Sequence, residues 1–292
     1  MDVHIVDGTY ELFRYHFGPS NRDAERGATV GVVGTLLSMV EGGATHVGVA
    51  TDHVVESFRN DLWPGYKSSL GMPPELLAQF PLVEDAMAAA GFVVWAMVEY
   101  EADDAMGAMA AVAAADDRVE RVVICTPDKD LGQCVGGKVW QLDRRKDAWF
   151  DAAGVRARLG VPPASIPDLL ALVGDTADGF PGLPGWGARS AASVLDRWGH
   201  LEDIPADPVT WDAGVRSAAK LNAVLRERWA EALLFRRIAT IETDAPVSDD
   251  VDALAWAGPP DPAAFAALCE HLGAPQLVAR TERAVRRAAP EQ

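Results

Sequence analysis

Cysteine is scarce in this sequence, and long hydrophobic runs are absent. Only Cys125, Cys134 and Cys269 occur among the 292 residues, and they form no CxxC pair. This excludes a disulfide-stapled secreted domain and a cysteine zinc site. No apolar run approaches the roughly 18 residues of a membrane helix, and the first residues, MDVHIVDG, include no basic stretch of a signal peptide. We therefore expect a soluble cytoplasmic protein without membrane contact.

Basic residues are also few. The chain has 26 lysines and arginines against 43 acidic residues, which gives a net charge of −17. That balance by itself argues against generic nucleic-acid binding. The argument loses its force if many acids gather in one place and hold cations, because a substrate then meets the field of the bound ions. The function therefore depends on where the acids lie.

Short β-rich segments alternate with alanine-rich helical segments in the first half of the chain. The strands are expected at 3–6, 46–50, 92–95 and 121–125, and the helices at about 28–42, 75–90 and 102–115. This alternation predicts an α/β fold with a mostly parallel, twisted central sheet flanked by helices. After residue 151 the pattern is mainly helical and is punctuated by proline and glycine, with a longer helix over 212–237.

Aspartates follow three of the predicted strands, and further acids open a predicted helix. The carboxyl ends of parallel strands lie along one edge of a sheet, so we expect these acids to converge on one crevice. Each acid alone is explained as a turn or cap residue. Together they would repel one another unless cations compensate their charge. The members of this acid set are Asp7, Asp52, Asp128, Asp130, Glu101, Asp103 and Asp104.

Oxygen ligands alone indicate which ions such a site prefers. Carboxylates suit Mg²⁺ or Mn²⁺, whereas a zinc site would include histidine or cysteine. Two such ions about 4 Å apart promote in-line displacement at phosphorus. The acids therefore predict phosphodiester hydrolysis with two or more bound Mg²⁺ or Mn²⁺ ions.

Five stretches resemble the 5′-nuclease superfamily, in particular the bacterial 5′–3′ exonuclease and flap endonuclease group that includes the 5′-nuclease domain of DNA polymerase I. They occur in the family's order and with family-like spacing, and they span about two thirds of the chain. They are IVDGTYELFR (5–14), ESFRNDLWPGYK (56–67), EYEADDAMG (99–107), CTPDKDLGQ (125–133) and ALVGDTADGFPGLPGWGARSAASVL (171–195).

The resemblance implies a PIN-like 5′-nuclease fold and a division of the chain. An α/β nuclease core would cover 1–160, with a helical arch at about 60–90. A helical helix-three-turn-helix region would cover 161–240 and bind duplex DNA. The C-terminal segment, 241–292, would pack back on the core.

The resemblance also assigns roles to individual residues. Arg14 and Lys67 match basic residues that contact the scissile phosphate, where cations stabilise the growing charge. The first metal would take its ligands from Asp7, Asp52, Glu101, Asp103, Asp104 and Asp128, and the second group would be Asp130, Asp175 and Asp178. The residues implied to contact the substrate are Arg59, Tyr66, Gly182, Gly185, Gly187 and Arg189.

The glycine-rich stretch GDTADGFPGLPGWGARSA resembles the family's helix-three-turn-helix loop. It would expose backbone groups and a helix N-terminus to a DNA phosphate. In the family this loop also holds a K⁺ ion, so a K⁺ site is implied here. Two positions depart from the family pattern: Gly179 replaces the usual asparagine, and Arg189 replaces the usual lysine with its charge kept.

The expected arch departs further from the family. Relatives carry basic residues there, whereas this chain has no lysine or arginine from Ser68 to Ala115. We expect a weaker electrostatic grip on a single-stranded flap, with duplex binding still dependent on salt. Apolar side chains would be available for contacts with bases or sugars: Leu70, Met72, Leu76, Leu77 and Phe80.

The function implied by the resemblance is a structure-specific 5′ nuclease acting near single-strand/duplex junctions in primer removal or DNA repair. Its substrates would be DNA with a 5′ flap, a nick or a free 5′ end, including RNA-primed DNA. We expect a monomer. Because the chain ends at Gln292 with no length left for a polymerase domain, we expect other proteins to supply polymerase and ligase activities. Two alternatives stay open: a PIN-like ribonuclease, and a non-catalytic protein that binds branched DNA.

Overall fold

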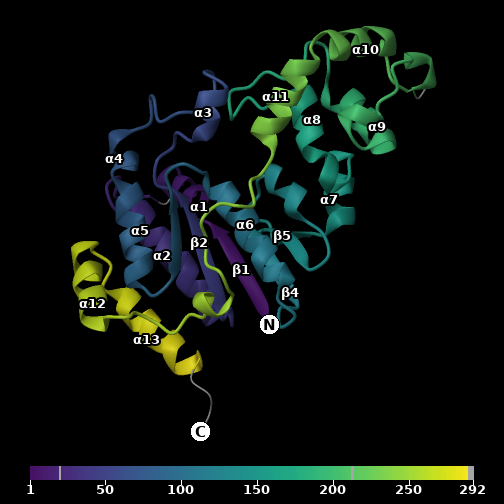
Figure 1. Ribbon diagram of the computed structural model, residues 1–292. Helices are drawn as coiled ribbons and strands as arrows, with labels where there is room; N and C mark the ends of the chain where they lie inside the picture. Colours follow the sequence, from purple (N-terminus) through teal and green to yellow (C-terminus); the bar gives the residue numbers. More distant parts are fainter. Residues whose placement is uncertain (20, 212–213, 289–292) are drawn as a thin grey trace. The chain divides into compact units, whose positions relative to one another are not determined.

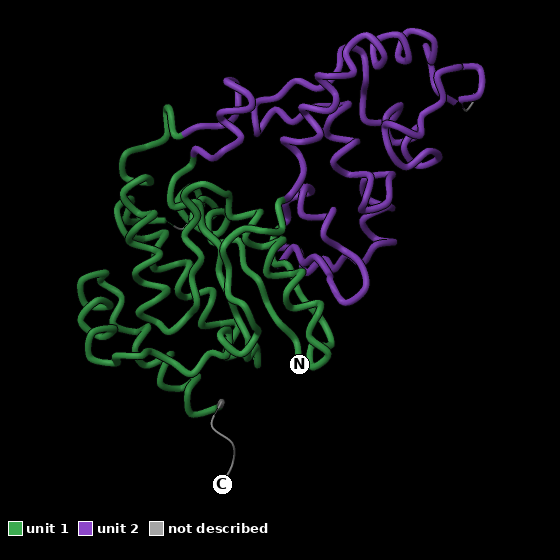
Figure 2. Tube along the Cα trace, viewed as in Figure 1, with its two compact units in different colours: residues 1–55, 69–126, 242–292 green, residues 56–68, 127–241 purple. Residues whose placement is uncertain are grey.

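The computed structural model describes residues 1–19, 21–211 and 214–288, which fall into two compact units (Figure 2). Unit 1 consists of Met1–Val55, Ser69–Thr126 and Glu242–Gln292, and unit 2 consists of Glu56–Ser68 and Pro127–Ile241. These boundaries differ from the expected division at 160 and 240, because unit 2 also takes in 56–68 and 127–160. No helix among the described residues is long and apolar enough to cross a membrane.

Unit 1 is built on four parallel strands in the order β3-β2-β1-β4 (Figure 1). They are β1 (Asp2–Asp7), β2 (His46–Asp52), β3 (Val93–Met97) and β4 (Arg121–Cys125), which confirms the four predicted strands. In the register of the sheet, Val6 of β1 lies beside Val49 of β2 and Cys125 of β4. The strands are rich in β-branched residues and are buried along most of their length, as expected for a sheet covered on both faces.

Helices flank this sheet within unit 1. α6 packs against β1, β2 and β4, α1 contacts β2, and α5 contacts β3. The C-terminal helices α12 and α13 pack against α5 and α2 respectively. The helices of unit 1 are α1 (Gly8–His16), α2 (Gly27–Glu41), α4 (Pro74–Leu77), α5 (Gln79–Ala89), α6 (Ala102–Ala115), α12 (Pro262–His271) and α13 (Gln276–Ala288).

Unit 2 is mainly helical and has a hydrophobic core of its own. Phe180 stacks on Phe235 with ring centroids 5.7 Å apart, and Leu170, Leu195 and Leu225 are fully buried in the same cluster. The helices are α3 (Phe58–Leu62), α7 (Ala152–Leu159), α8 (Ile166–Val173), α9 (Ala188–Trp198), α10 (Ala218–Glu227) and α11 (Trp229–Ala239). Two further strands of unit 2, β5 (Val139–Asp143) and β6 (Ala148–Phe150), pair antiparallel with each other.

The prediction of one longer helix over 212–237 is wrong. Residues 212–213 lie outside the described residues, and the remainder forms two helices, α10 and α11, that meet at Arg228. The backbone of Arg228 leaves the helical region at φ −108° and ψ 32°, and its N–H caps α10 by donating to the carbonyl of Val224 at 2.9 Å. No glycine or proline occurs near this break, so the sequence carries no signal for it.

Candidate functional site

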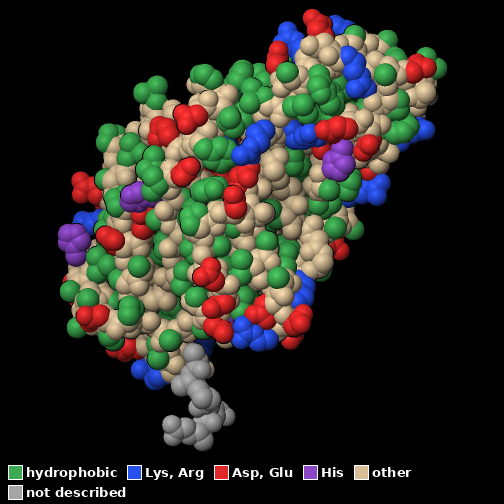
Figure 3. Space-filling model, viewed as in Figure 1, with side chains coloured by type: hydrophobic (Ala, Val, Ile, Leu, Met, Phe, Trp, Pro, Cys, Tyr) green, Lys and Arg blue, Asp and Glu red, His purple; other side chains and the backbone are tan. Residues whose placement is uncertain are grey.

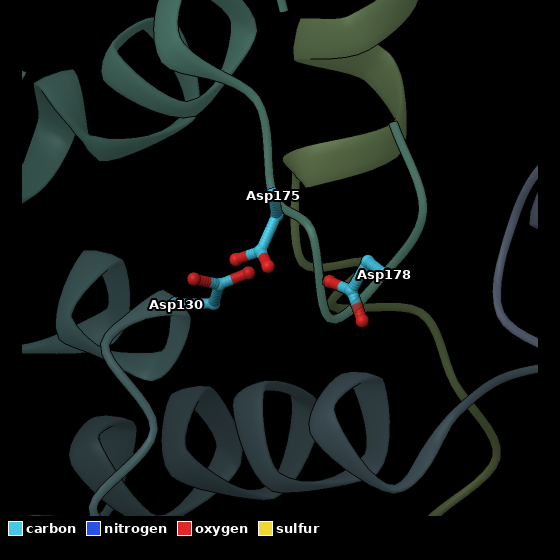
Figure 4. A group of neighbouring side chains, drawn as sticks. All are labelled: Asp130, Asp175 and Asp178. Carbon is cyan, nitrogen blue, oxygen red and sulfur yellow. The ribbon is translucent and has the colours of Figure 1, made fainter. Parts of the chain in front are cut away.

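Three aspartates of unit 2 point toward one another (Figure 4). Asp130 lies at the start of a 3-10 turn, Asp130–Cys134, whereas Asp175 and Asp178 lie in the loop after α8. One carboxylate oxygen from each lies within 4.8 Å of the others. Asp130 and Asp175 are buried, and Asp178 is half-buried. We call these residues the acid trio; they match the expected second metal group.

Local hydrogen bonds hold the acid trio in place. The Asp130 N–H donates to Oδ1 of Asp128 at 2.9 Å, which fixes the turn after β4. Asp175 and Phe180 exchange two backbone hydrogen bonds, of 2.9 and 3.1 Å, so the loop between them folds back on itself. The Ala177 N–H donates to Oδ1 of Asp175 at 2.8 Å. This tight loop brings Asp178 to the same side as Asp175.

Two lysines lie against the acid trio. The Lys129 ammonium donates to Oδ2 of Asp175 and lies 3.3 Å from Oδ1 of Asp130. The Lys67 ammonium lies 3.5 Å from Oδ1 of Asp178, and the Lys67 backbone N–H donates to the Asp178 carbonyl at 2.9 Å. Two ammonium groups therefore already lie against the carboxylates of the acid trio.

Electrostatics favour a cation at this place. Burial, together with the negative charge of Asp128, raises the pKa of Asp130 to about 8. Burial would also raise the pKa of Asp175, but the hydrogen bond and charge of Lys129 lower it below its ordinary value. Oδ1 of Asp130 is buried and accepts no hydrogen bond among the described residues. A cluster of carboxylates that neighbouring negative charge makes hard to ionise fits a divalent cation such as Mg²⁺ or Mn²⁺, whose positive charge would favour the ionised form.

The loop between α8 and α9 holds the expected phosphate-contacting glycines. Gly185 and Gly187 are exposed, and Arg189 is exposed in the first turn of α9. Gly182 differs, because it is buried with φ +65° and a Cβ there would lie 2.3 Å from the backbone nitrogen of Gly174. Gly182 therefore permits two backbone segments to cross, and this placement disagrees with the expected substrate contact.

Gly179, the departure from the family pattern, has a local explanation. Its φ is +80°, and a Cβ there would lie 2.1 Å from the carbonyl oxygen of Gly65. Its own carbonyl accepts a hydrogen bond from the Trp63 indole at 3.0 Å. The segment 63–67 thus lies directly on the loop that carries Asp178, and an asparagine side chain has no room at position 179.

Unit 1 carries its own acids at the carboxyl ends of β1 and β2. Asp7 ends β1 and caps α1: its Oδ1 accepts the Tyr10 N–H at 2.7 Å, and its Oδ2 accepts the Thr126 hydroxyl at 2.8 Å. Asp52 ends β2, and its Oδ1 accepts the Ala102 N–H at 2.8 Å. Both aspartates are buried, with exposed fractions of 6% and 8%. The structure thus ties the end of β2 to the start of α6.

The acids at the start of α6 differ in their surroundings. Glu101 and Asp104 are buried, and Asp103 is half-buried. Asp104 is held by two backbone donors, because its Oδ2 accepts the Glu101 N–H at 2.9 Å and its Oδ1 accepts the Glu242 N–H at 2.8 Å. These contacts make Asp104 a capping residue of α6 and an anchor for the C-terminal segment.

Arg14, expected at the scissile phosphate, has a buried partner that sequence reasoning missed. Its Nε donates to Oε2 of Glu11 at 2.9 Å, and Glu11 is 2% exposed. The guanidinium also lies 4.2 Å from the centre of the Tyr15 ring. The spacing of three residues on a helix was the available signal for this pair. Glu11 holds the guanidinium in one orientation.

Two residues expected to contact the substrate are buried instead. Arg59 is 2% exposed, and it donates to the carbonyls of Ile238 at 2.7 Å and Thr240 at 2.9 Å. It therefore fastens α3 to the end of α11, which disagrees with a substrate contact. Tyr66 is 6% exposed, and its ring belongs to the hydrophobic core of unit 2.

The apolar residues of the expected arch are only partly available. Leu76 and Phe80 are buried in the core, with exposed fractions of 0% and 3%, so the expectation that they contact a nucleic acid is wrong for them. Leu70 is 92% exposed, Leu77 is 36% exposed and Met72 is half-buried. Leu76 and Phe80 are four residues apart, so the helical pattern places them on the same face. This face packs against the rest of unit 1, which buries both side chains.

Carboxylate-rich sites without histidine or cysteine are typical of enzymes that cleave phosphate esters with divalent cations, and this is the class that the fold and the acid trio indicate. A family model described as 5′-3′ exonuclease, N-terminal resolvase-like domain, matches residues 2–160. A second, described as 5′-3′ exonuclease, C-terminal SAM fold, matches residues 161–262. The chain therefore belongs to the 5′–3′ exonuclease family.

Relatives with known sequences agree with this assignment. The DNA polymerase I of Pseudomonas aeruginosa is 33% identical over 282 residues, which cover 92% of this chain and 30% of that protein. The DNA polymerase I of Bacillus caldotenax is 30% identical over 291 residues, which cover 95% of this chain and 32% of that protein. The chain thus spans about a third of the length of these curated relatives.

Solved structures share the fold. The T5 D15 protein, co-crystallised with metal ions, superimposes with a TM-score of 0.65 at 18% identity and covers 99% of this chain and 100% of its own. The catalytic core of Rad2 in complex with a DNA substrate gives a TM-score of 0.63 at 15% identity, with 99% and 92% covered. At these identities the likeness concerns the fold: a mostly parallel sheet with flanking helices and a helical C-terminal region.

Proposed function

We propose that this protein is a metal-dependent, structure-specific 5′ nuclease that acts as a monomer on DNA with a 5′ flap, a nick or a free 5′ end, including RNA-primed DNA. It would cleave phosphodiesters near the single-strand/duplex junction in primer removal or repair. The observation that carries the proposal is the acid trio, in which a buried oxygen of Asp130 accepts no hydrogen bond among the described residues, in a chain of the 5′–3′ exonuclease family.

The residues that would hold the cations are all carboxylates, which suits Mg²⁺ or Mn²⁺. When bound, such cations supply Lewis acidity for hydrolysis of the phosphodiester. One group of ligands is the acid trio. The other is drawn from the acids at the strand ends and at the start of α6: Asp7, Asp52, Glu101, Asp103, Asp104 and Asp128.

The chain's own basic residues would bind and orient the substrate. Arg14 presents a guanidinium held by the buried Glu11, and Lys67 presents an ammonium beside Asp178, so each supplies a fixed positive charge for a phosphate oxygen. The exposed Gly185, Gly187 and the start of α9 would bind a phosphate of the duplex, with a K⁺ ion at this loop. Arg59, Tyr66 and Gly182 are left out of the proposal because they are buried.

An assay with labelled nucleic acids tests the proposal. Flap DNA, nicked duplex, linear duplex and hairpin RNA would each be incubated with Mg²⁺, Mn²⁺ or a chelator. We expect products from flap and nicked DNA with either metal and none with the chelator. Product from hairpin RNA alone would favour a PIN-like ribonuclease, and tight DNA binding without product would favour a non-catalytic binder.

A further inference from the structure

Lys129 lies inside the acid trio, between two of its members. Its ammonium donates to Oδ2 of Asp175 and lies 3.3 Å from Oδ1 of Asp130. This ammonium therefore brings a positive charge to the place where a divalent cation would be bound.

The ammonium and a divalent cation cannot use the same oxygens at once. A Mg²⁺ ion lies about 2.1 Å from its ligand oxygens, whereas an ammonium nitrogen lies about 2.8 Å from a carboxylate oxygen. Two cations that share the oxygens of Asp130 and Asp175 would be in direct contact and would repel each other strongly. The Lys129 side chain is 43% exposed on a flexible stem, so it has a path into solvent.

We infer that the ammonium group of Lys129 neutralises the acid trio in the metal-free protein, and that a divalent cation displaces this group on binding. The inference rests on the proposed function, because it presumes that the acid trio holds a metal. Lys129 is then a positioning residue that keeps three like-charged carboxylates together before the metal arrives. It also sets the metal concentration at which the trio becomes occupied.

Two lysine-to-methionine variants test whether Lys129 lowers the affinity for Mg²⁺. Lys129→Met removes the competing ammonium and keeps the length of the side chain. Lys146→Met is the matched control, because Lys146 lies 3.3 Å from Asp143 in the same unit and is 75% exposed. Mg²⁺ would be titrated calorimetrically into each protein without DNA. We expect binding about five- to tenfold tighter in Lys129→Met, since a charge-assisted hydrogen bond at a partly exposed site no longer competes.

Thermal unfolding supplies a second readout in the same proteins. The Lys129→Met variant should unfold at a lower temperature than the wild type in chelator, and Mg²⁺ should raise its unfolding temperature by more than it raises that of the wild type. The Lys146→Met control should show the wild-type response to Mg²⁺. An equal or smaller response in Lys129→Met would overturn the inference.

Reductive methylation measures the displacement directly in the wild-type protein. The ε-amine of Lys129 should react faster with Mg²⁺ present, as measured by mass spectrometry, whereas Lys146 should react at the same rate. Mg²⁺ binding without a change at Lys129 would overturn the displacement and leave the metal centre standing. No Mg²⁺ binding in any of the three proteins would overturn both the metal centre and the role of Lys129.

Discussion

Single carboxylates of the acid trio can be tested without disturbing the fold. Asp178 is half-buried in a loop, and Asp178→Asn keeps the shape of the side chain while removing its charge. We expect weaker Mn²⁺ binding and a loss of activity of about a hundredfold, because the variant withdraws one charged ligand. DNA binding measured in chelator should be unchanged, since no phosphate contact is lost.

The matched control for this substitution is Asp196→Asn in the same unit. Asp196 is 41% exposed, pairs with Arg156 at 2.6 Å and is not among the proposed metal ligands. It should keep wild-type cleavage rates and Mn²⁺ affinity. Wild-type rates from Asp178→Asn as well would place the reaction away from the acid trio.

At the scale of the elements, the loop after α8 depends on glycine at position 179. Gly179→Asn restores the residue usual in the family, but its Cβ would lie 2.1 Å from the Gly65 carbonyl oxygen. We expect a loss of about 2 kcal/mol or more in the free energy of unfolding, measured by urea denaturation. Gly185→Asn is the control, because its φ is also positive, at +84°, and the nearest atom is 3.8 Å away.

In the control, the free energy of unfolding should fall by only about 1 kcal/mol, which is the cost of placing a residue other than glycine in the left-handed conformation. Equal losses in the two variants would mean that the close approach of segment 63–67 to the loop does not exist in solution.

The ion pair between α2 and α13 contributes a stability that should change with pH in a known direction. Glu41 accepts a hydrogen bond from Arg280 at 2.7 Å, and this bond is the main cause of the lowered pKa of Glu41. A lowered carboxyl pKa contributes stability above the ordinary glutamate pKa, and this stability is lost as the pH falls through the lowered value. Glu41→Gln should therefore cost about 0.5–1 kcal/mol at pH 7, a modest value because both side chains of the pair are partly exposed to solvent. This cost should shrink as the pH falls below the ordinary pKa of glutamate.

Unfolding curves at pH 7 and at a series of lower pH values check this prediction. Glu282→Gln is the control, since Glu282 is 61% exposed and lies 3.9 Å from Arg286 on the same helix. A difference between wild type and Glu41→Gln that does not shrink as the pH is lowered would contradict the assignment.

Elements with a strong local pattern were predictable, and contacts between distant residues were not. The four parallel strands and α6 follow from β-branched runs and an alanine-rich segment that opens with acids. Arg59 was expected at the substrate, and its burial could not be predicted, because its carbonyl partners, Ile238 and Thr240, lie about 180 residues away in the sequence. The position of Lys129 inside the acid trio could not be predicted for the same reason, because its main partner, Asp175, lies 46 residues further along the chain.

The whole molecule has a net charge of −17, so the proposed contacts with DNA would depend on a few local positive groups. Basic residues of the helical unit are partly used within the protein: Arg236 pairs with Glu202 at 2.6 Å and with Asp168 at 3.0 Å. On the face drawn in Figure 3, lysine and arginine side chains over α9 to α11 are interspersed with acids. Arg189 is exposed in the first turn of α9 and would be one of the cations available to a duplex.

The lack of basic residues in the segment after Lys67 leads to a prediction about how cleavage depends on salt. Since no lysine or arginine occurs from Ser68 to Ala115, a longer single-stranded flap adds no phosphate neutralised by that segment. The fall of cleavage rate with salt should therefore be no steeper for a long-flap substrate than for a flapless nicked duplex. Leu70→Lys, at a position that is 92% exposed, should steepen the long-flap slope by about 1 and leave the nicked substrate unchanged. A much steeper long-flap slope in the wild type would show that the flap meets cations elsewhere.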